Sequence, residues 1–155
     1  MIYIASDHAG FELKNTLVAY LISEGFEVED CGVHEYDKND DYPDFIYPCA
    51  KKVAENSGSL GIILGGSGEG EAIVANKVKG IRATAYYGGN EEIIKLSKTH
   101  NDANIFSLGA RFFTEDEAKK AVRLWLDTMY LGEERHERRH KKIAEIEEEE
   151  RGSGN

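Results

Sequence analysis

The chain has 155 residues, of which 41% are hydrophobic and 31% are charged, and its formal net charge is −10. This length suits one compact domain, and no stretch reaches the roughly 18 apolar residues that a membrane span requires. The negative charge argues against bulk binding to nucleic acid, which is held mainly by positive protein surface.

Predicted strands and helices alternate along the chain. Apolar and β-branched runs predict strands over residues 2–5, 26–30, 60–64, 81–85 and 104–108. Apolar residues three or four positions apart predict helices around residues 11–21 and 118–126. Such alternation is typical of βαβ units, in which helices cover both faces of a parallel sheet. The sequence therefore predicts a doubly wound α/β domain with five strands.

The first residues and the cysteines indicate the compartment. Met1 leads directly into the first predicted strand, without the basic region and apolar stretch of a signal peptide. Cys31 and Cys49 fit neither a disulfide framework nor the ligand spacing of a zinc site. We therefore expect a cytoplasmic protein with reduced thiols and no metal.

Two segments lack a hydrophobic period. Residues 32–43 carry several acidic side chains and predict a long surface loop, a kind of segment that is often functional. After residue 132 the chain is highly charged, with an acidic run over residues 145–150. We expect a single domain over residues 1–145, whose terminal helix frays into a disordered acidic tail over residues 146–155.

Polar clusters lie next to three predicted strands. Asp7 and His8 follow the first strand, residues 65–71 follow the third, and His100 and Asn101 lie just before the fifth. Ligands of open parallel sheets bind outside the carboxyl ends of the strands. We therefore expect all three clusters to belong to the strand-end loops where a ligand binds, although polar turns would account for the same residues.

A glycine-rich loop occupies residues 65–71, which read Gly-Gly-Ser-Gly-Glu-Gly-Glu and enter a predicted helix. Backbone N–H groups and the helix dipole at such a helix start favour an anion. The loop fits neither the dinucleotide fingerprint, because Glu71 occupies the third glycine position, nor the P-loop pattern. It predicts an anion cradle, while an ordinary strand-to-helix turn would also explain the glycines.

Single residues of the three clusters remain ambiguous. Glu71 lies in a first helical turn, where the dipole stabilises a carboxylate by about 0.3–1 kcal/mol, and it is also a candidate general base. Asp7 is either a helix N-cap or a site residue, and His8 is either a solvated residue of the first turn or a ligand contact. His100 and Asn101 fit a turn equally well.

Three arginines in the last third of the chain are candidates for binding an anion. Arg135 and Arg139 are four residues apart, so they share a helix face and could hold one phosphate together. Ion pairs with neighbouring glutamates would explain them as well. Arg111 is a lone cation with the same two interpretations.

Taken in order, these blocks resemble ribose-5-phosphate isomerase type B and the related galactose-6-phosphate isomerase subunits. Each block is weak alone, but together they are specific, and the resemblance covers about residues 1–145. The matching blocks are residues 6–10 (SDHAG), 41–44 (DYPD), 66–70 (GSGEG), 75–83 (ANKVKGIRA), 100–104 (HNDAN), 109–111 (GAR) and 135–139 (RHERR).

The resemblance implies a Rossmann-like three-layer α/β/α domain that forms a homodimer, possibly a tetramer, with the active site at the subunit interface. It implies neither a metal nor an organic cofactor. One branch of the family moves the proton with a cysteine just before the glycine-rich loop, where this chain has Gly65. The other branch uses a glutamate at the end of the loop, and Glu71 occupies that position. The chain thus resembles the glutamate branch.

The resemblance also implies the reaction, the interconversion of ribose 5-phosphate and ribulose 5-phosphate through an enediolate. Glu71 would carry the proton between C1 and C2, while His100 would open the sugar ring with Asp7 as its partner. Backbone N–H groups of the glycine-rich loop would stabilise the oxyanion. The implied substrate-binding residues are His8, Tyr42, Gly66, Ser67, Gly68, Glu69, Gly70, Asn101, Arg111, Arg135 and Arg139.

Two alternatives remain at this point. A galactose 6-phosphate or allose 6-phosphate isomerase would use the same chemistry, and a non-catalytic regulator would bind a sugar phosphate without converting it. The joint presence of Glu71 and His100 favours an enzyme, because binding alone needs neither a base nor a ring opener. An acidic run beside the basic helix, without aromatic stacking motifs, argues against an RNA-binding module. The expected partners are therefore a sugar phosphate and a second subunit, without nucleic acid or membrane.

Overall fold

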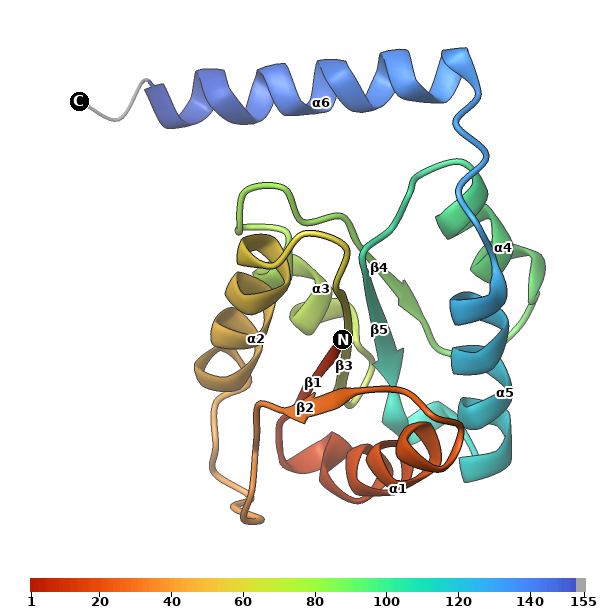
Figure 1. The fold of residues 1–155 in the computed structure, drawn as a ribbon. Coiled ribbons are helices and arrows are strands. Elements are labelled where there is room, and N and C mark those ends of the chain that lie inside the picture. Colours follow the sequence, from red (N-terminus) through yellow and green to blue (C-terminus); the bar gives the residue numbers. More distant parts are fainter. Residues whose placement is uncertain (153–155) are drawn as a thin grey trace.

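A parallel sheet forms the centre of the computed structural model, which describes residues 1–152 (Figure 1). Its strands are β1 (Ile2–Ser6), β2 (Val28–Asp30), β3 (Leu60–Gly65), β4 (Ala83–Tyr86) and β5 (Ile105–Gly109). They lie in the order β2-β1-β3-β5-β4, and every neighbouring pair is parallel. The predicted five-stranded parallel sheet is confirmed, with strand ends that differ from the predicted ones by one or two residues.

Helices connect the strands and cover both faces of the sheet. They are α1 (Phe11–Ser23), α2 (Pro43–Glu55), α3 (Glu69–Ala75), α4 (Glu92–Thr99), α5 (Glu115–Asp127) and α6 (Glu134–Gly152), with short 3₁₀ turns η1 (His8–Gly10) and η2 (Ala110–Phe112). Side chains of α1, α4 and α5 pack on one face and those of α2 and α3 on the other, which confirms the three-layer α/β/α fold. Within residues 1–152, no helix combines the length and the apolar character needed to cross a membrane.

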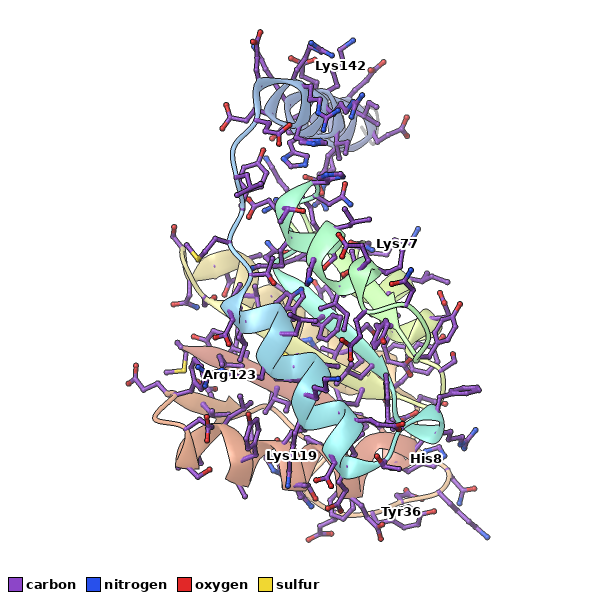
Figure 2. All side chains as sticks on the ribbon, turned by 90° about the vertical axis from the view of Figure 1, so that its right-hand side faces the viewer. His8, Tyr36, Lys77, Lys119, Arg123 and Lys142 are labelled. Carbon is purple, nitrogen blue, oxygen red and sulfur yellow. The ribbon has the colours of Figure 1, made fainter. Side chains whose placement is uncertain are left out.

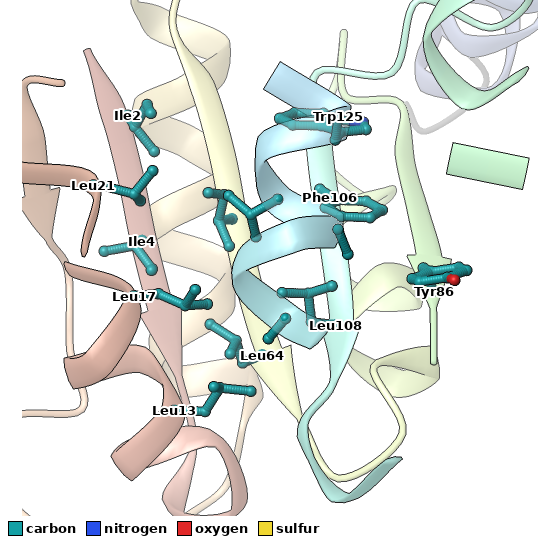
Figure 3. Close-up of a cluster of buried hydrophobic side chains, with 14 of the residues drawn as sticks. Ile2, Ile4, Leu13, Leu17, Leu21, Leu64, Tyr86, Phe106, Leu108 and Trp125 are labelled. Atoms are coloured by element: carbon teal, nitrogen blue, oxygen red, sulfur yellow. The ribbon is translucent and has the colours of Figure 1, made fainter. Parts of the chain in front are cut away.

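Alternate residues of each strand fill two separate cores. Ile2 and Ile4 of β1 point into the core beneath α1 and α5, and the alternate residues Tyr3 and Ala5 point to the α2 side. In the first core, drawn in Figure 3, the rings of Phe106 and Trp125 stack with centroids 5.2 Å apart. Burial on both faces is typical of parallel sheets, so the strands hold a rigid frame whose loops carry the polar groups.

The last helix, α6, continues beyond the predicted end of the domain. Residues 146–152 are helical, where the sequence led us to expect a disordered tail, and residues 153–155 of that predicted tail lie outside the described residues. The acidic end of α6 contacts the segment before β4: Glu147 accepts hydrogen bonds from Gly80 N at 3.0 and 3.2 Å, and Glu148 pairs with Lys79. These contacts join residues far apart in the sequence, so the composition of the tail does not predict them. They explain the extra helical turns.

Candidate active site

The carboxyl ends of three strands meet at one edge of the sheet. Ser6 of β1 pairs with Leu64 of β3, and Gly65 at the end of β3 pairs with Gly109 at the end of β5. The loops that follow are tied together, because Arg111 N donates to Gly66 O at 3.2 Å. Asp7, the glycine-rich loop and Arg111 therefore lie at the same edge, as predicted for the first two clusters.

The glycine-rich loop passes closely over its neighbours. Gly68 has φ of 79°, and a Cβ added there would lie 2.9 Å from the backbone of Leu108. A Cβ on Gly70 would lie 2.8 Å from the hydroxyl oxygen of Tyr42, so the Tyr42 side chain covers this loop. Ser67 Oγ accepts a hydrogen bond from Glu69 N at 3.2 Å. The loop thus delivers the chain into α3, whose first N–H groups have no acceptor within the helix.

Glu71 has its side chain folded back over the end of β3. The residue is only 4% exposed, and a Cβ added to Gly65 would overlap its carboxylate. Burial raises the pKa of the Glu71 carboxyl and the nearby charge of Asp7 raises it further, while a backbone hydrogen bond opposes them. A carboxyl with a raised pKa is suited to accept and return a proton near neutral pH. The absence of a side chain at Gly65 leaves space for the Glu71 carboxylate.

Asp7 and His8 are held by different partners. Asp7 is 6% exposed, and its Oδ1 accepts from Ala9 N at 2.9 Å and from Gly10 N at 3.3 Å, so it caps η1 as one interpretation of the sequence predicted. His8 Nδ1 lies 2.5 Å from Oδ1 of Asp40, a residue that the sequence analysis did not single out. The hydrogen bond to Asp40 is the main cause that raises the pKa of His8.

Asp7, His8 and Asp40 are close enough for their ligand atoms to lie within 4.8 Å of one another. Their hydrogen bonds already account for this closeness, since His8 bonds to Asp40 and Asp7 caps the backbone of η1. A cation here would have to replace the bond between His8 and Asp40. We therefore interpret the cluster as hydrogen-bonded groups and assign no metal to it.

A cavity of about 460 Å³ opens beside these groups. It is lined by His8, Ala9, Glu12, Tyr36 and Arg111. The Arg111 guanidinium approaches the glycine-rich loop, since a Cβ on Gly66 would lie 3.1 Å from its Nη1. His8 and Arg111 thus offer two cationic donors to one anion next to the loop. The position fits the phosphate contacts that the resemblance implied for both residues.

The third predicted cluster lies at the opposite edge of the sheet. His100 ends α4, and β5 starts only at Ile105, so His100 and Asn101 lie at the amino end of β5. The five residues of β5 separate that end from Glu71 by about 13–17 Å. The prediction that His100 and Asn101 belong to the loops at the carboxyl ends of the strands was therefore wrong, because residues that precede a parallel strand and residues that follow it lie at opposite edges.

The amino edge has its own polar groups, under α6. The His100 ring stacks on the ring of His136, with centroids 4.3 Å apart. Arg135 is 57% exposed and bonds to Glu133 at 3.1 Å, as the ion-pair interpretation predicted. Arg139 is exposed on the same helix. Figure 2 shows His8 and Tyr36 at the end of the molecule away from Lys142 of α6, so neither arginine approaches His8 within one chain.

Two residues beside the predicted ones were missed. Asp40 lies in the loop over residues 32–43, and the only signal for it was the acidic character of that loop. His136 lies inside the matching block 135–139 and is 4% exposed. Burial lowers the pKa of His136, and His100 lowers it further. A neutral His136 can stack under His100 without repelling a charge on it.

Comparisons with known proteins agree with this geometry. The chain matches the family model described as Ribose/Galactose Isomerase over residues 2–143. Ribose-5-phosphate isomerase B of Mycolicibacterium paratuberculosis is 42% identical over 146 residues, which cover 94% of this chain and 91% of the relative. The structure of ribose-5-phosphate isomerase B from Mycoplasma genitalium with bound ribulose-5-phosphate has a TM-score of 0.89 and 42% identity, covering 96% of both chains. That of the Clostridium thermocellum isomerase B has a TM-score of 0.86 and 41% identity, covering 96% of this chain and 97% of that one.

Proposed function

This chain belongs to the ribose/galactose isomerase family, and from that premise we propose that it interconverts ribose 5-phosphate and ribulose 5-phosphate. It is thus a sugar-phosphate aldose–ketose isomerase. The structural observation that carries the proposal is the buried Glu71 beside the glycine-rich loop, with the His8 and Arg111 cavity next to it. The Mycoplasma genitalium relative of known structure holds ribulose-5-phosphate, a product of this reaction.

Glu71 is the proton carrier in the proposed mechanism. It removes the proton from C2 of the open-chain aldose, and the electron pair moves to form an enediolate between C1 and C2. The same carboxyl then returns the proton to C1, while the hydroxyl proton moves from O2 to O1, so that no atom is gained or lost. The raised pKa of Glu71 supports both steps, because the protonated form must be accessible after the first transfer.

The glycine-rich loop is the proposed site for the negative oxygen of the enediolate. Backbone N–H groups of residues 66–70 are fixed by close packing against β5 and Tyr42, so they need no reorganisation as charge develops. Ser67 supplies a hydroxyl next to them, and Glu69 shapes the first turn of α3. Tyr42, whose hydroxyl lies over Gly70, is placed to contact the open-chain sugar.

Ring opening requires a second copy of the chain. Glu71 and His100 lie at opposite edges of the sheet, so one chain cannot present both to a single pentose. We propose a homodimer in which His100 and Asn101 of one subunit face the carboxyl edge of the other, where Asp7 is a candidate partner for His100. Arg135 and Arg139 of that second copy would join His8 and Arg111 on the phosphate. This arrangement would bring four cationic side chains to one phosphate, two from each subunit.

A substrate panel tests the proposed activity. Ribose 5-phosphate, allose 6-phosphate and galactose 6-phosphate are each supplied to the enzyme, and ketose formation is measured. We expect ribose 5-phosphate to give the highest kcat/KM. A higher value for either hexose phosphate would favour the hexose alternative, and binding of all three without conversion would favour a regulator.

Complementation tests the shared site. A Glu71→Gln variant and a His100→Ala variant, each inactive, are mixed under conditions where subunits exchange. If each site takes Glu71 from one chain and His100 from the other, half of the dimers formed at random carry one intact site, so about a quarter of the parent activity returns. Exchange without recovery would show that both residues of a site come from one chain.

A further inference from the structure

Asp40 is a buried carboxylate, and within residues 1–152 its one ion pair is with His8. Its side chain is 6% exposed, although it lies in a loop whose other acidic residues are exposed. Oδ1 lies 2.5 Å from Nδ1 of His8 and also accepts from the His8 backbone N–H at 3.2 Å. Oδ2 is buried and has no hydrogen-bond partner in the described part of the chain. A carboxylate so far from water needs a positive charge beside it, and His8 is positioned to carry that charge.

His8 is also held from other sides. The Tyr36 ring packs edge-on against it, with centroids 6.2 Å apart and an interplanar angle of 86°. Glu12 and Arg111 share its cavity, and Asp7 precedes it in the chain. The hydrogen bond to Asp40 raises the pKa of His8, burial lowers it, Asp7 raises it, and Arg111 lowers it. The ring is thus fixed through Nδ1, and its Nε2 is left for a ligand in the cavity.

We propose that Asp40 is a positioning residue for phosphate binding, which fixes the His8 ring through Nδ1 and keeps it as the imidazolium, so that Nε2 donates a charge-assisted hydrogen bond to the substrate phosphate. This inference rests on the proposed function, because it takes a sugar phosphate as the ligand of the cavity. It assigns a role to the loop between β2 and α2. Asp40 of that loop lies 32 positions after His8 in the sequence and sets the charge of the His8 ring next to β1.

The Asp40→Asn variant tests the proposal through its pH dependence. Asparagine keeps an oxygen that can accept the His8 hydrogen bond but removes the charge, so the pKa of His8 falls toward its ordinary value of 6.5. Below that value the ring is charged in both proteins, and between the two pKa values only the parent ring is charged. The ratio of the variant KM to the parent KM should therefore be near one at about pH 5.5 and rise as the pH passes 6.5, to at most about tenfold at about pH 7.5. Changes in the substrate's own charge cancel in this ratio, and kcat should change much less than KM.

The Asp41→Asn variant is the matched control, since it removes the same charge from the neighbouring exposed position. Its KM ratio should stay near one at every pH. An Asp40→Asn ratio that is constant across the pH range, or a fall in kcat alone, would overturn the proposal and leave Asp40 with a purely structural part.

A titration of His8 by NMR gives a second reading that needs no turnover. The midpoint in the parent should lie above 6.5 and should fall in Asp40→Asn but not in Asp41→Asn. Inorganic phosphate, used as the probe, should bind the parent more tightly than Asp40→Asn at about pH 7.5 and equally at about pH 5.5. A parent midpoint at or below 6.5 would refute the inference. If the substrate panel showed no ketose formation, the proposed activity would be refuted. These titrations would then still decide whether Asp40 sets the charge of His8.

Discussion

The two edges of the sheet differ in how far one chain completes them. At the carboxyl edge the acidic groups are buried and already bonded: Glu71 is 4% exposed and Asp7 is 6% exposed. At the amino edge under α6 the two candidate phosphate-binding arginines are exposed: Arg135 reaches 57%, and Arg139 is exposed on the same helix. Burial and fixed contacts hold a reactive group in position, whereas exposed arginines are accessible to a ligand. The difference suggests that the carboxyl edge carries the reactive half of the site and that the amino edge supplies the binding half to another copy.

Removing the proposed base, Glu71, should inactivate the reactive half of the site and have the largest effect on activity. Glu71→Gln keeps the shape of the side chain but cannot accept a proton, so kcat should fall by about 10²–10⁴-fold while the substrate still binds. Exchange gives an independent measurement, because the parent should transfer deuterium from the solvent to carbon and the variant should not. Turnover close to that of the parent, with Cys31 and Cys49 also replaced, would end the proposed mechanism.

Displacing the base without changing it should have the next largest effect. A Cβ at Gly65 overlaps the Glu71 carboxylate, so Gly65→Ala should push the base from its position and lower kcat by about 10–10²-fold. Gly152→Ala is the control, because a Cβ there meets no atom within 4 Å. If Gly65→Ala kept both the kcat and the melting temperature of the parent, the folded-back position of Glu71 would be unimportant for the reaction.

Weakening the amino half should change binding more than chemistry. Arg135→Ala or Arg139→Ala should raise KM by about tenfold and lower kcat less, because phosphate contacts are made in both the ground state and the transition state. Arg138→Ala removes the same charge from the same helix and should leave KM unchanged. A fall in kcat without a change in KM would move these arginines from the binding half to the reactive half.

The sequence predicted the frame well because the frame depends on local patterns. Apolar and β-branched runs predicted the five strands, and the position of Glu71 at the end of the glycine-rich loop placed it at a helix start. The contact between His8 and Asp40 joins residues 32 positions apart, and no local pattern signals it. The acidic end of α6 is held by Gly80 and Lys79, which lie even further away in sequence. The sequence alone could have placed His100 at the amino edge of the sheet, because His100 precedes β5 rather than following it.

The smallest expected effect concerns stability and sharpens the contrast between the two edges. The pKa of Glu71 in the folded protein is raised above its ordinary value of 4.5, mainly by burial. The parent is therefore most stable below that value and loses stability as the pH rises through the raised pKa, because the buried carboxyl then becomes charged. The side chain introduced in the Glu71→Gln variant stays neutral, so the variant does not lose this stability as the pH rises. It should melt at a higher temperature than the parent at pH 7 and at the same temperature near about pH 4. Each kcal/mol of difference in the free energy of unfolding should shift the melting temperature by about 2–4 °C. Glu69→Gln, at an exposed position of the same helical turn, should give no such gain. Thermal melts across this pH range measure the difference, and a parent that is more stable than Glu71→Gln at pH 7 would show that the buried carboxylate is stabilised where it lies rather than held ready to take up a proton.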